Sequence, residues 1–206
     1  LERHMKNKLL ALLLTMSTLP AFAGVDGYLG YTSDYMWRGV SQTSGNAAIQ
    51  GELSVSKGGL YGGVWASEVD FGDEATYEMD LFLGYELKVS DKFSLDVGVI
   101  QYNWDKGYDD VEELFVKGNL KNISVAYYVD MEDSDRDYME MGLKLPFVKF
   151  MDVSLNYGMF DSENDFWAMN MVKDWGKWEV SLLIMEDAKQ DQFMDNASLG
   201  DRKSTR

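Results

Sequence analysis

The chain contains no cysteine, and its only histidine, His4, lies near the start of its 206 residues. Without cysteine no disulfide can form, and a site built on imidazole or thiolate, the usual ligands of zinc, is excluded once His4 is set aside. The lack of a second histidine also removes the usual general base of hydrolases. We therefore expect a protein that is not an enzyme, with no catalytic residues, no metal site and no cofactor.

Proline and basic residues are also scarce. Only Pro20 and Pro146 are present, no linker rich in serine or glycine appears, and the composition does not shift along the chain, so we expect one domain. Lysine and arginine number 19 against 35 acidic residues, a formal net charge of −16. Because nucleic acid is bound through positive charge, it is excluded as an expected partner.

Long apolar runs are absent as well. The longest run, residues 9–14, is far shorter than the roughly 18 apolar residues that a membrane-spanning helix needs. It follows Lys6 and Lys8 and precedes Ala-Phe-Ala at 21–23, the pattern of a secretory signal peptide. We predict that translation starts at Met5 and that cleavage follows Ala23. Residues 1–23 then hold the upstream residues and the leader, and 24–206 form a single barrel domain.

A repeated unit fills the rest of the chain. Between Gly24 and Asp187, about eleven segments of some ten residues alternate apolar and polar positions. In residues 77–87, every odd position is tyrosine, methionine or leucine, whereas the even positions include three carboxylates. A period of two indicates β-strands with one apolar and one hydrated face.

The connections between these segments alternate in length. Short connections that carry lysine lie at 57–59, 88–92, 121–122, 146–149 and 173–177; mostly longer acidic ones lie at 70–74, 103–112, 130–137, 161–165 and from 186 onward. Short turns at one rim and long loops at the other are typical of an outer-membrane β-barrel. A soluble β-sandwich would give the same alternation of side chains, with its apolar faces inward, but no such alternation of loops.

Aromatic residues near the ends of the segments also favour a barrel. In bilayer-spanning barrels such residues form girdles at the two interfaces. The residues concerned are Tyr28, Trp37, Trp65, Tyr102, Trp104, Phe147, Phe160, Trp167, Trp175 and Trp178. We therefore expect an all-β fold: an antiparallel up-and-down transmembrane β-barrel of about twelve strands, eleven of them visible in the sequence.

Three stretches carry a family resemblance. Residues 33–43 read SDYMWRGVSQT, residues 63–72 read GVWASEVDFG and residues 78–85 read EMDLFLGY. The chain resembles the TorF family of putative porins, secreted proteins of Gram-negative bacteria, from the end of the leader to about Asp187. The resemblance implies an outer-membrane β-barrel of twelve strands with a channel role, and it supplies no catalytic residues.

The last residues depart from this pattern. Outer-membrane barrels generally end in a strand with a terminal aromatic residue, but residues 201–206 are polar. Eleven strands would end at the outer rim, and bacterial single-chain barrels have even strand numbers. We expect a truncated version of a twelve-stranded protein. The first and eleventh strands should then leave a gap, or the tail at 194–205 should supply an improvised twelfth strand.

Arg38, inside the signature stretch, is expected to lie in the interior. One interpretation places it in a constriction opposite Glu78 and Asp80; the other makes it a structural ion pair that fills a narrow barrel. Carboxylates on the hydrated faces of several strands are expected to line the pore with it. These are Glu78, Asp80, Glu86, Asp96, Glu113, Glu140, Asp152 and Glu179. A carboxylate pair for hydrolysis is the alternative for these residues, and divalent cation binding is the alternative to solvation for the acidic loops.

The expected function is passive diffusion of small solutes or ions through an acidic path, biased towards cations. The protein would lie in the cell outer membrane, in contact with its lipid and lipopolysaccharide. Two alternatives remain open: a non-conducting structural barrel and a soluble periplasmic β-sandwich that binds a ligand. The sequence specifies neither the solute nor the oligomeric state.

The loop pattern generates a prediction of topology. The short turns should face the periplasm and the long loops the outside. Ser134 lies in a long acidic loop and Ser90 in a short turn. In intact cells, a Ser134→Cys variant should react with a membrane-impermeant thiol reagent, whereas Ser90→Cys should be protected. Equal labelling of the two variants would contradict the assignment.

Overall fold

The computed structural model describes residues 8–16, 24–160 and 165–186. The predicted cleavage site at Ala23, the loop residues Asp161 and Glu163 and the tail from 187 lie outside these ranges. The strands are β1 Lys8–Met16, β2 Val25–Thr32, β3 Met36–Trp37, β4 Val40–Ser41, β5 Ala48–Lys57, β6 Leu60–Glu68, β7 Tyr77–Ser90, β8 Phe93–Trp104, β9 Val111–Leu120, β10 Ile123–Asp130, β11 Tyr138–Lys144, β12 Asp152–Phe160, β13 Phe166–Asp174 and β14 Trp178–Glu186.

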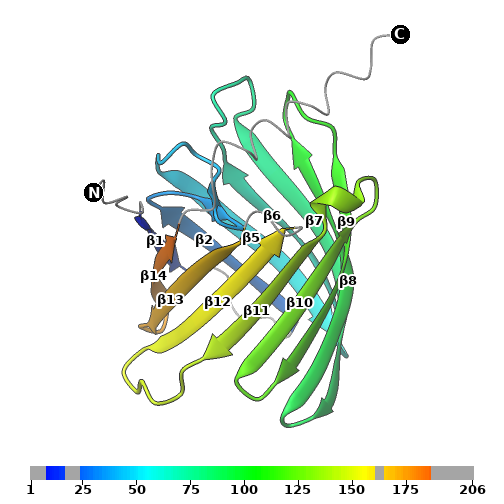
Figure 1. Cartoon of the computed structure of the whole chain (residues 1–206), viewed down its shortest axis with the longest axis vertical. Helices are drawn as coiled ribbons and strands as arrows, with labels where there is room; N and C mark the ends of the chain where they lie inside the picture. Colours follow the sequence, from blue (N-terminus) through cyan, green and yellow to red (C-terminus); the bar gives the residue numbers. More distant parts are fainter. Residues whose placement is uncertain (1–7, 17–23, 161–164, 187–206) are drawn as a thin grey trace, which may run out of the picture.

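One antiparallel sheet contains the eleven long strands that follow the predicted leader. β2 pairs with β5, and β5 to β14 then follow in chain order, each beside the next, as an up-and-down meander. The strands run obliquely and the sheet curls (Figure 1). A single 3₁₀ turn at Ser134–Arg136 is the one helical element of the described residues, in which no helix is long and apolar enough to cross a membrane. The predicted all-β antiparallel class and the eleven segments are confirmed.

The two ends of this eleven-stranded sheet do not meet. No ladder joins β2 directly to β14 within the described residues; β1, from the predicted leader, lies between them. It pairs with β14 from Lys8↔Glu186 to Met16↔Trp178, and with β2 only from Leu13↔Thr32 to Met16↔Leu29. The space between the first and eleventh strands is therefore one strand wide, but it is not left open as expected, because residues 8–16 occupy it. The tail at 194–205, the other expected occupant, lies outside the described residues.

The two faces of the sheet have opposite polarity. The convex face carries most of the large apolar side chains, such as Leu29, Leu81 and Leu83, which are 45–56% exposed. The concave face holds buried polar groups, among them Gln50 and Ser67. A soluble protein buries its apolar side chains and exposes its charges. This sheet does the reverse over most of its length.

The register of the sheet gathers the long connections at one rim. Two-residue turns join β5 to β6 at residues 58–59, β7 to β8 at residues 91–92 and β9 to β10 at residues 121–122. These turns lie at the lower rim in Figure 1, and the long loops lie at the upper rim. The longest connection, between β2 and β5, contains the small hairpin of β3 and β4.

The expected aromatic girdles are only partly present. Phe147, Trp167, Trp175 and Trp178 are 47–72% exposed, as a girdle requires. Other aromatic residues assigned to the girdles instead lie inside, where Phe160 belongs to a buried cluster and Trp37, Trp65 and Trp104 pack against buried residues. That part of the prediction is wrong because the connection from β2 to β5 folds inward and needs apolar partners there.

Glycines make room for rings on the concave face. Gly84 and Gly98 lie directly opposite each other in β7 and β8. A Cβ atom on Gly98 would lie 2.4 Å from Cζ of Phe115 and 2.5 Å from the carbonyl oxygen of Leu83. A Cβ atom on Gly118 would meet only the side chain of Leu95, at 3.8 Å. An added methyl group should therefore destabilise the fold at Gly98 and have little effect on it at Gly118.

We predict that Gly98→Ala lowers the free energy of unfolding by about 1–3 kcal/mol, because backbone and ring must both move. Gly118→Ala, the matched control, should change it by less than about 0.5 kcal/mol. Urea unfolding of refolded protein in detergent, followed by tryptophan fluorescence, measures both. Equal effects of the two substitutions would show that Gly98 does not pack against Phe115 as described.

Candidate functional site

The signature stretch 33–43 folds from the long-loop rim into the interior as a hairpin. β3 and β4 pair through Met36↔Ser41 and Trp37↔Val40, so Arg38 and Gly39 form a two-residue turn. Both have positive φ, 46° at Arg38 and 88° at Gly39. Two left-handed residues in succession are the geometry of a type I′ turn, which glycine adopts freely. Arg38 pays about 1–2 kcal/mol for this conformation, so other contacts must hold it there.

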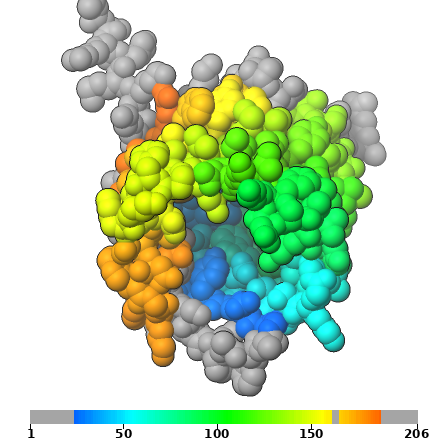
Figure 2. Space-filling view, turned by 90° about the horizontal axis from the view of Figure 1, so that it is seen from below, coloured from blue at the N-terminus to red at the C-terminus, as the bar shows by residue number. Residues whose placement is uncertain are grey.

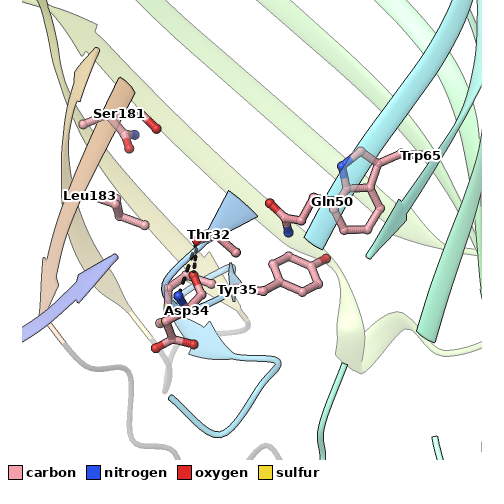
Figure 3. A pocket seen from close by; sticks show the side chains of 9 residues that line it. Thr32, Asp34, Tyr35, Gln50, Trp65, Ser181 and Leu183 are labelled. Carbon is pink, nitrogen blue, oxygen red and sulfur yellow. Dashed lines mark hydrogen bonds between the residues drawn. The ribbon is translucent and has the colours of Figure 1, made fainter. Parts of the chain in front are cut away.

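Hydrogen bonds at the base of the hairpin fix its conformation. The Ser41 hydroxyl donates to Oδ1 of Asp34 at 2.6 Å, and the amide of Tyr35 donates to Oγ1 of Thr43 at 3.1 Å. The Thr32 hydroxyl donates to the carbonyl of Asp34 at 2.7 Å (Figure 3). All five residues are buried. Short polar side chains that bond to nearby backbone favour such turns, which explains the composition of the stretch.

A buried ion pair holds the tip of the hairpin. Nη1 and Nη2 of Arg38 donate to the two carboxylate oxygens of Glu113 in β9 at 2.7 and 2.6 Å. The two side chains are 6% and 3% exposed. The Tyr102 hydroxyl donates to the same carboxylate at 3.0 Å. A bidentate contact between guanidinium and carboxylate is the strongest common form of charged hydrogen bond.

Aromatic rings surround the same guanidinium. Its Cζ lies 4.3 Å from the ring centre of Tyr138, 4.4 Å from Trp37, 4.5 Å from Tyr128 and 5.6 Å from Phe160. Distances below about 6 Å allow cation–π attraction. We call Glu113, Tyr128, Tyr138 and Phe160 the cation cage; Trp37 completes it from the hairpin side.

The surroundings keep Arg38 charged. Burial by itself would lower the pKa of the guanidinium, but the neighbouring Tyr102 and Glu113 outweigh burial, so the pKa of Arg38 lies above its ordinary value. A permanent positive charge in the interior needs a partner, because an unpaired buried charge costs several kcal/mol. Glu113 supplies it.

A second anchor holds the other side of the hairpin. The Tyr35 hydroxyl donates to Oε1 of Glu78 at 3.4 Å, and Nε1 of Trp104 donates to Oε2 at 3.3 Å. The Tyr35 ring lies 5.2 Å from that of Trp65. Since these partners come from β6 to β8 and the cation cage comes from β9 to β12, the hairpin reaches across the interior.

The predicted partner of Arg38 was wrong in one respect. Glu78 and Asp80 were expected opposite it, but the ion pair is made with Glu113. The expectation failed because parity assigns a residue to a face without fixing its height along the strand. The structural ion pair, the other interpretation, matches the contact.

All predicted pore-lining carboxylates come from the concave face, and they fall into two groups. Glu78, Asp80 and Glu113 are buried, 2–6% exposed, beside the hairpin. The others lie nearer the short-turn rim and are partly or fully exposed: Glu86, Asp96, Glu140, Asp152 and Glu179. Asp96 accepts a hydrogen bond from the Tyr61 hydroxyl at 2.8 Å. That these residues line a pore stays a prediction.

The interior is hollow on the short-turn side of the hairpin. Figure 2, seen from that end, shows an opening with blue atoms of the N-terminal part of the chain deep inside. A cavity of about 190 Å³ lies between the hairpin and the wall of the sheet. Tyr35, Gln50 and Trp65 lie on one side of it, and Ser181 and Leu183 on the other (Figure 3).

The sequence analysis did not predict the cation cage, although the sequence contains a pattern that indicates it. Tyr128 lies on the same face as Ser124 and Asp130, and Tyr138 on the same face as Glu140. An aromatic residue on an otherwise polar face indicates an interior partner. Among the described residues, no group of three or more carboxylates is placed to hold a metal ion.

Removing the charge of one partner tests the ion pair. Glu113→Gln should lower the free energy of unfolding by about 3–5 kcal/mol, because it leaves the Arg38 charge buried without a counter-charge. Replacing both partners by methionine should recover most of that loss. Urea unfolding measures the effect, with Glu132→Gln in an exposed loop as the control. A loss no larger than that of the control would contradict the buried pair.

The chain matches the family described as "Bacterial protein of unknown function (Gcw_chp)" over residues 23–192. No curated protein matches it, and no solved structure matches it. The matched family carries no assigned activity, so the likeness to TorF putative porins remains a prediction. Because the match spans most of its length, the chain belongs to the bacterial Gcw_chp family of unknown function.

Proposed function

We propose that the protein is an outer-membrane β-barrel that forms a narrow channel for passive, cation-biased diffusion of small solutes. The observation that carries the proposal is the polarity of the sheet: apolar side chains outside, charged and polar side chains inside. A transmembrane barrel requires this arrangement, because its outer face meets lipid and its inner face meets water. The partners are then outer-membrane lipid and lipopolysaccharide.

The soluble alternative fits the sheet less well. A β-sandwich packs the apolar faces of two sheets against each other, but the described residues form one long curled sheet and the small pair β3–β4. Its apolar face remains exposed over many strands. An exposed apolar area of that extent indicates contact with a membrane or another protein.

Closure of the barrel is part of the proposal. In lipid, every backbone amide and carbonyl must be paired within the protein. The edges of β2 and β14 are separated by one strand, as the pairing of β1 with both shows. A strand at this position, where residues 8–16 lie here, would close a twelve-stranded barrel. We call this position, between β2 and β14, the seam.

The cation bias follows from the charges on the concave face. On the concave face between the hairpin and the short-turn rim, the carboxylates Glu86, Asp96, Glu140, Asp152 and Glu179 outnumber the lysines Lys88, Lys117 and Lys144. A cleft lined by one sign of charge concentrates ions of the opposite sign. Inward carboxylates therefore lower the energy of a small cation and raise that of an anion.

The hairpin supports a second candidate, a non-conducting barrel. It crosses the long-loop half of the interior, and its contacts with Glu78 and Glu113 are buried. A plug held in this way would leave a structural protein with a hydrated inner vestibule. The two candidates share the fold and the location and differ only in whether the hairpin leaves a path.

Conductance decides between them. The triple variant Glu86→Gln, Asp96→Asn and Glu140→Gln should lower the K⁺/Cl⁻ permeability ratio by about twofold or more, because clefts of one sign sustain potentials of several kT. Reversal potentials of refolded protein in planar bilayers under a KCl gradient measure it. The control removes the same charge from exposed positions at the long-loop rim: Asp109→Asn and Asp110→Asn in the loop before β9, and Glu112→Gln near the start of β9. Absent or anion-selective conductance of the wild type would refute the channel.

A further inference from the structure

We propose that the cation cage is a recognition site for solutes that carry a guanidinium group, and that Arg38 occupies it as a tethered stand-in. The inference rests on the proposed channel, because a solute must enter the interior to reach the cage. It goes further by naming the chemical class that the channel would recognise.

The geometry of the cage fits a guanidinium group. Glu113 presents both carboxylate oxygens to the two terminal nitrogens of Arg38, at 2.6 and 2.7 Å. Tyr138 and Tyr128 place their rings 4.3 and 4.5 Å from the central carbon. A planar fork that hydrogen-bonds in its plane and stacks on rings is a property of guanidinium, and an ammonium group lacks it.

The cage and its occupant are built on separate parts of the chain. Glu113, Tyr128, Tyr138 and Phe160 come from β9, β10, β11 and β12, which are fixed by their ladders. Arg38 comes from a hairpin turn and has a left-handed conformation. If the hairpin moves, the wall keeps its carboxylate and rings in place. The site therefore does not depend on its present occupant for its shape.

The Glu113 carboxylate supplies a second argument. It is almost fully buried and receives the Tyr102 hydroxyl as well as Arg38. Without Arg38 its two oxygens would lose their paired donors in a place screened from water, with rings around it. A cation that can also donate two parallel hydrogen bonds restores what is lost, whereas sodium or urea restores only part of it.

Binding to an Arg38→Ala variant tests the proposal. In detergent, ethylguanidinium should bind saturably to this variant at millimolar concentration, seen as a change in tryptophan fluorescence and a rise in unfolding temperature. Arg38→Ala combined with Glu113→Gln should bind at least about tenfold more weakly, because the paired hydrogen bonds and the charge are lost. Lys106→Ala, which removes a cation from an exposed loop and keeps Arg38 in the cage, should respond only at higher ethylguanidinium concentrations, where the ligand competes with Arg38.

Sodium chloride at equal ionic strength and urea serve as ligand controls, since the first lacks the shape and the second lacks the charge. If Arg38→Ala folds, shown by a heat-modifiable gel shift, but responds to ethylguanidinium no more than to these controls, the cage is only a structural ion pair. This readout needs no conductance. A non-conducting wild type whose Arg38→Ala variant binds ethylguanidinium would therefore refute the channel and keep the site.

A variant that keeps Arg38 gives a separate test if the Arg38→Ala proteins do not fold. The chain has no cysteine, and Val40 in the hairpin is 5% exposed. In a Val40→Cys protein, ethylguanidinium should raise the rate of reaction with a thiol reagent to a plateau at least about threefold higher, because it competes with Arg38 for Glu113. An unchanged rate would overturn the proposal.

Discussion

The arrangement of the described strands depends on how their backbone groups are paired. Eleven strands present apolar side chains on the convex face. If that face meets lipid, as proposed, each strand must find its hydrogen bonds within the sheet. Every internal strand does so through its two neighbours. Only the outer edges of β2 and β14 remain, and β1 pairs with both. The curl of the sheet, its strand order and the seam all follow from this constraint.

The interior depends on a second constraint, that the buried positive charge of Arg38 has a partner. Because the concave face is acidic, a positive group there is stabilised, and the hairpin brings Arg38 to Glu113. The rings of Tyr128 and Tyr138 then serve two purposes, as apolar partners for the hairpin and as partners of the cation. On the same face, Gly84 and Gly98 leave room for the rings of Tyr61 and Phe115.

The sequence was sufficient to predict the strands and which face each side chain occupies. Each segment alternates apolar and polar residues with a period of two, and this local pattern can be interpreted without knowing any distant contact. It was sufficient for placing Arg38 inside. It was insufficient for the partner of Arg38, which depends on how far β9 is shifted against β2 around the sheet. The aromatic residues were misassigned for a related reason: Trp65 and Trp104 lie near strand ends, as girdle residues do, but on the inward face. Their odd or even position in the strand indicated the inward face, whereas their distance from the turn did not.

The position of the hairpin separates two properties that a simple pore would combine. Glu86 and Asp96 face the hollow near the short-turn rim, whereas Glu78 and Glu113 lie against the hairpin towards the long loops. In the proposed channel, the first group would set which charge is attracted and the second would set whether anything passes. The Arg38–Glu113 pair is almost fully buried, so water cannot easily replace either partner. In the proposed channel, a soluble cation could take the place of Arg38 only if the hairpin moved away from β9, and the same movement would open the interior.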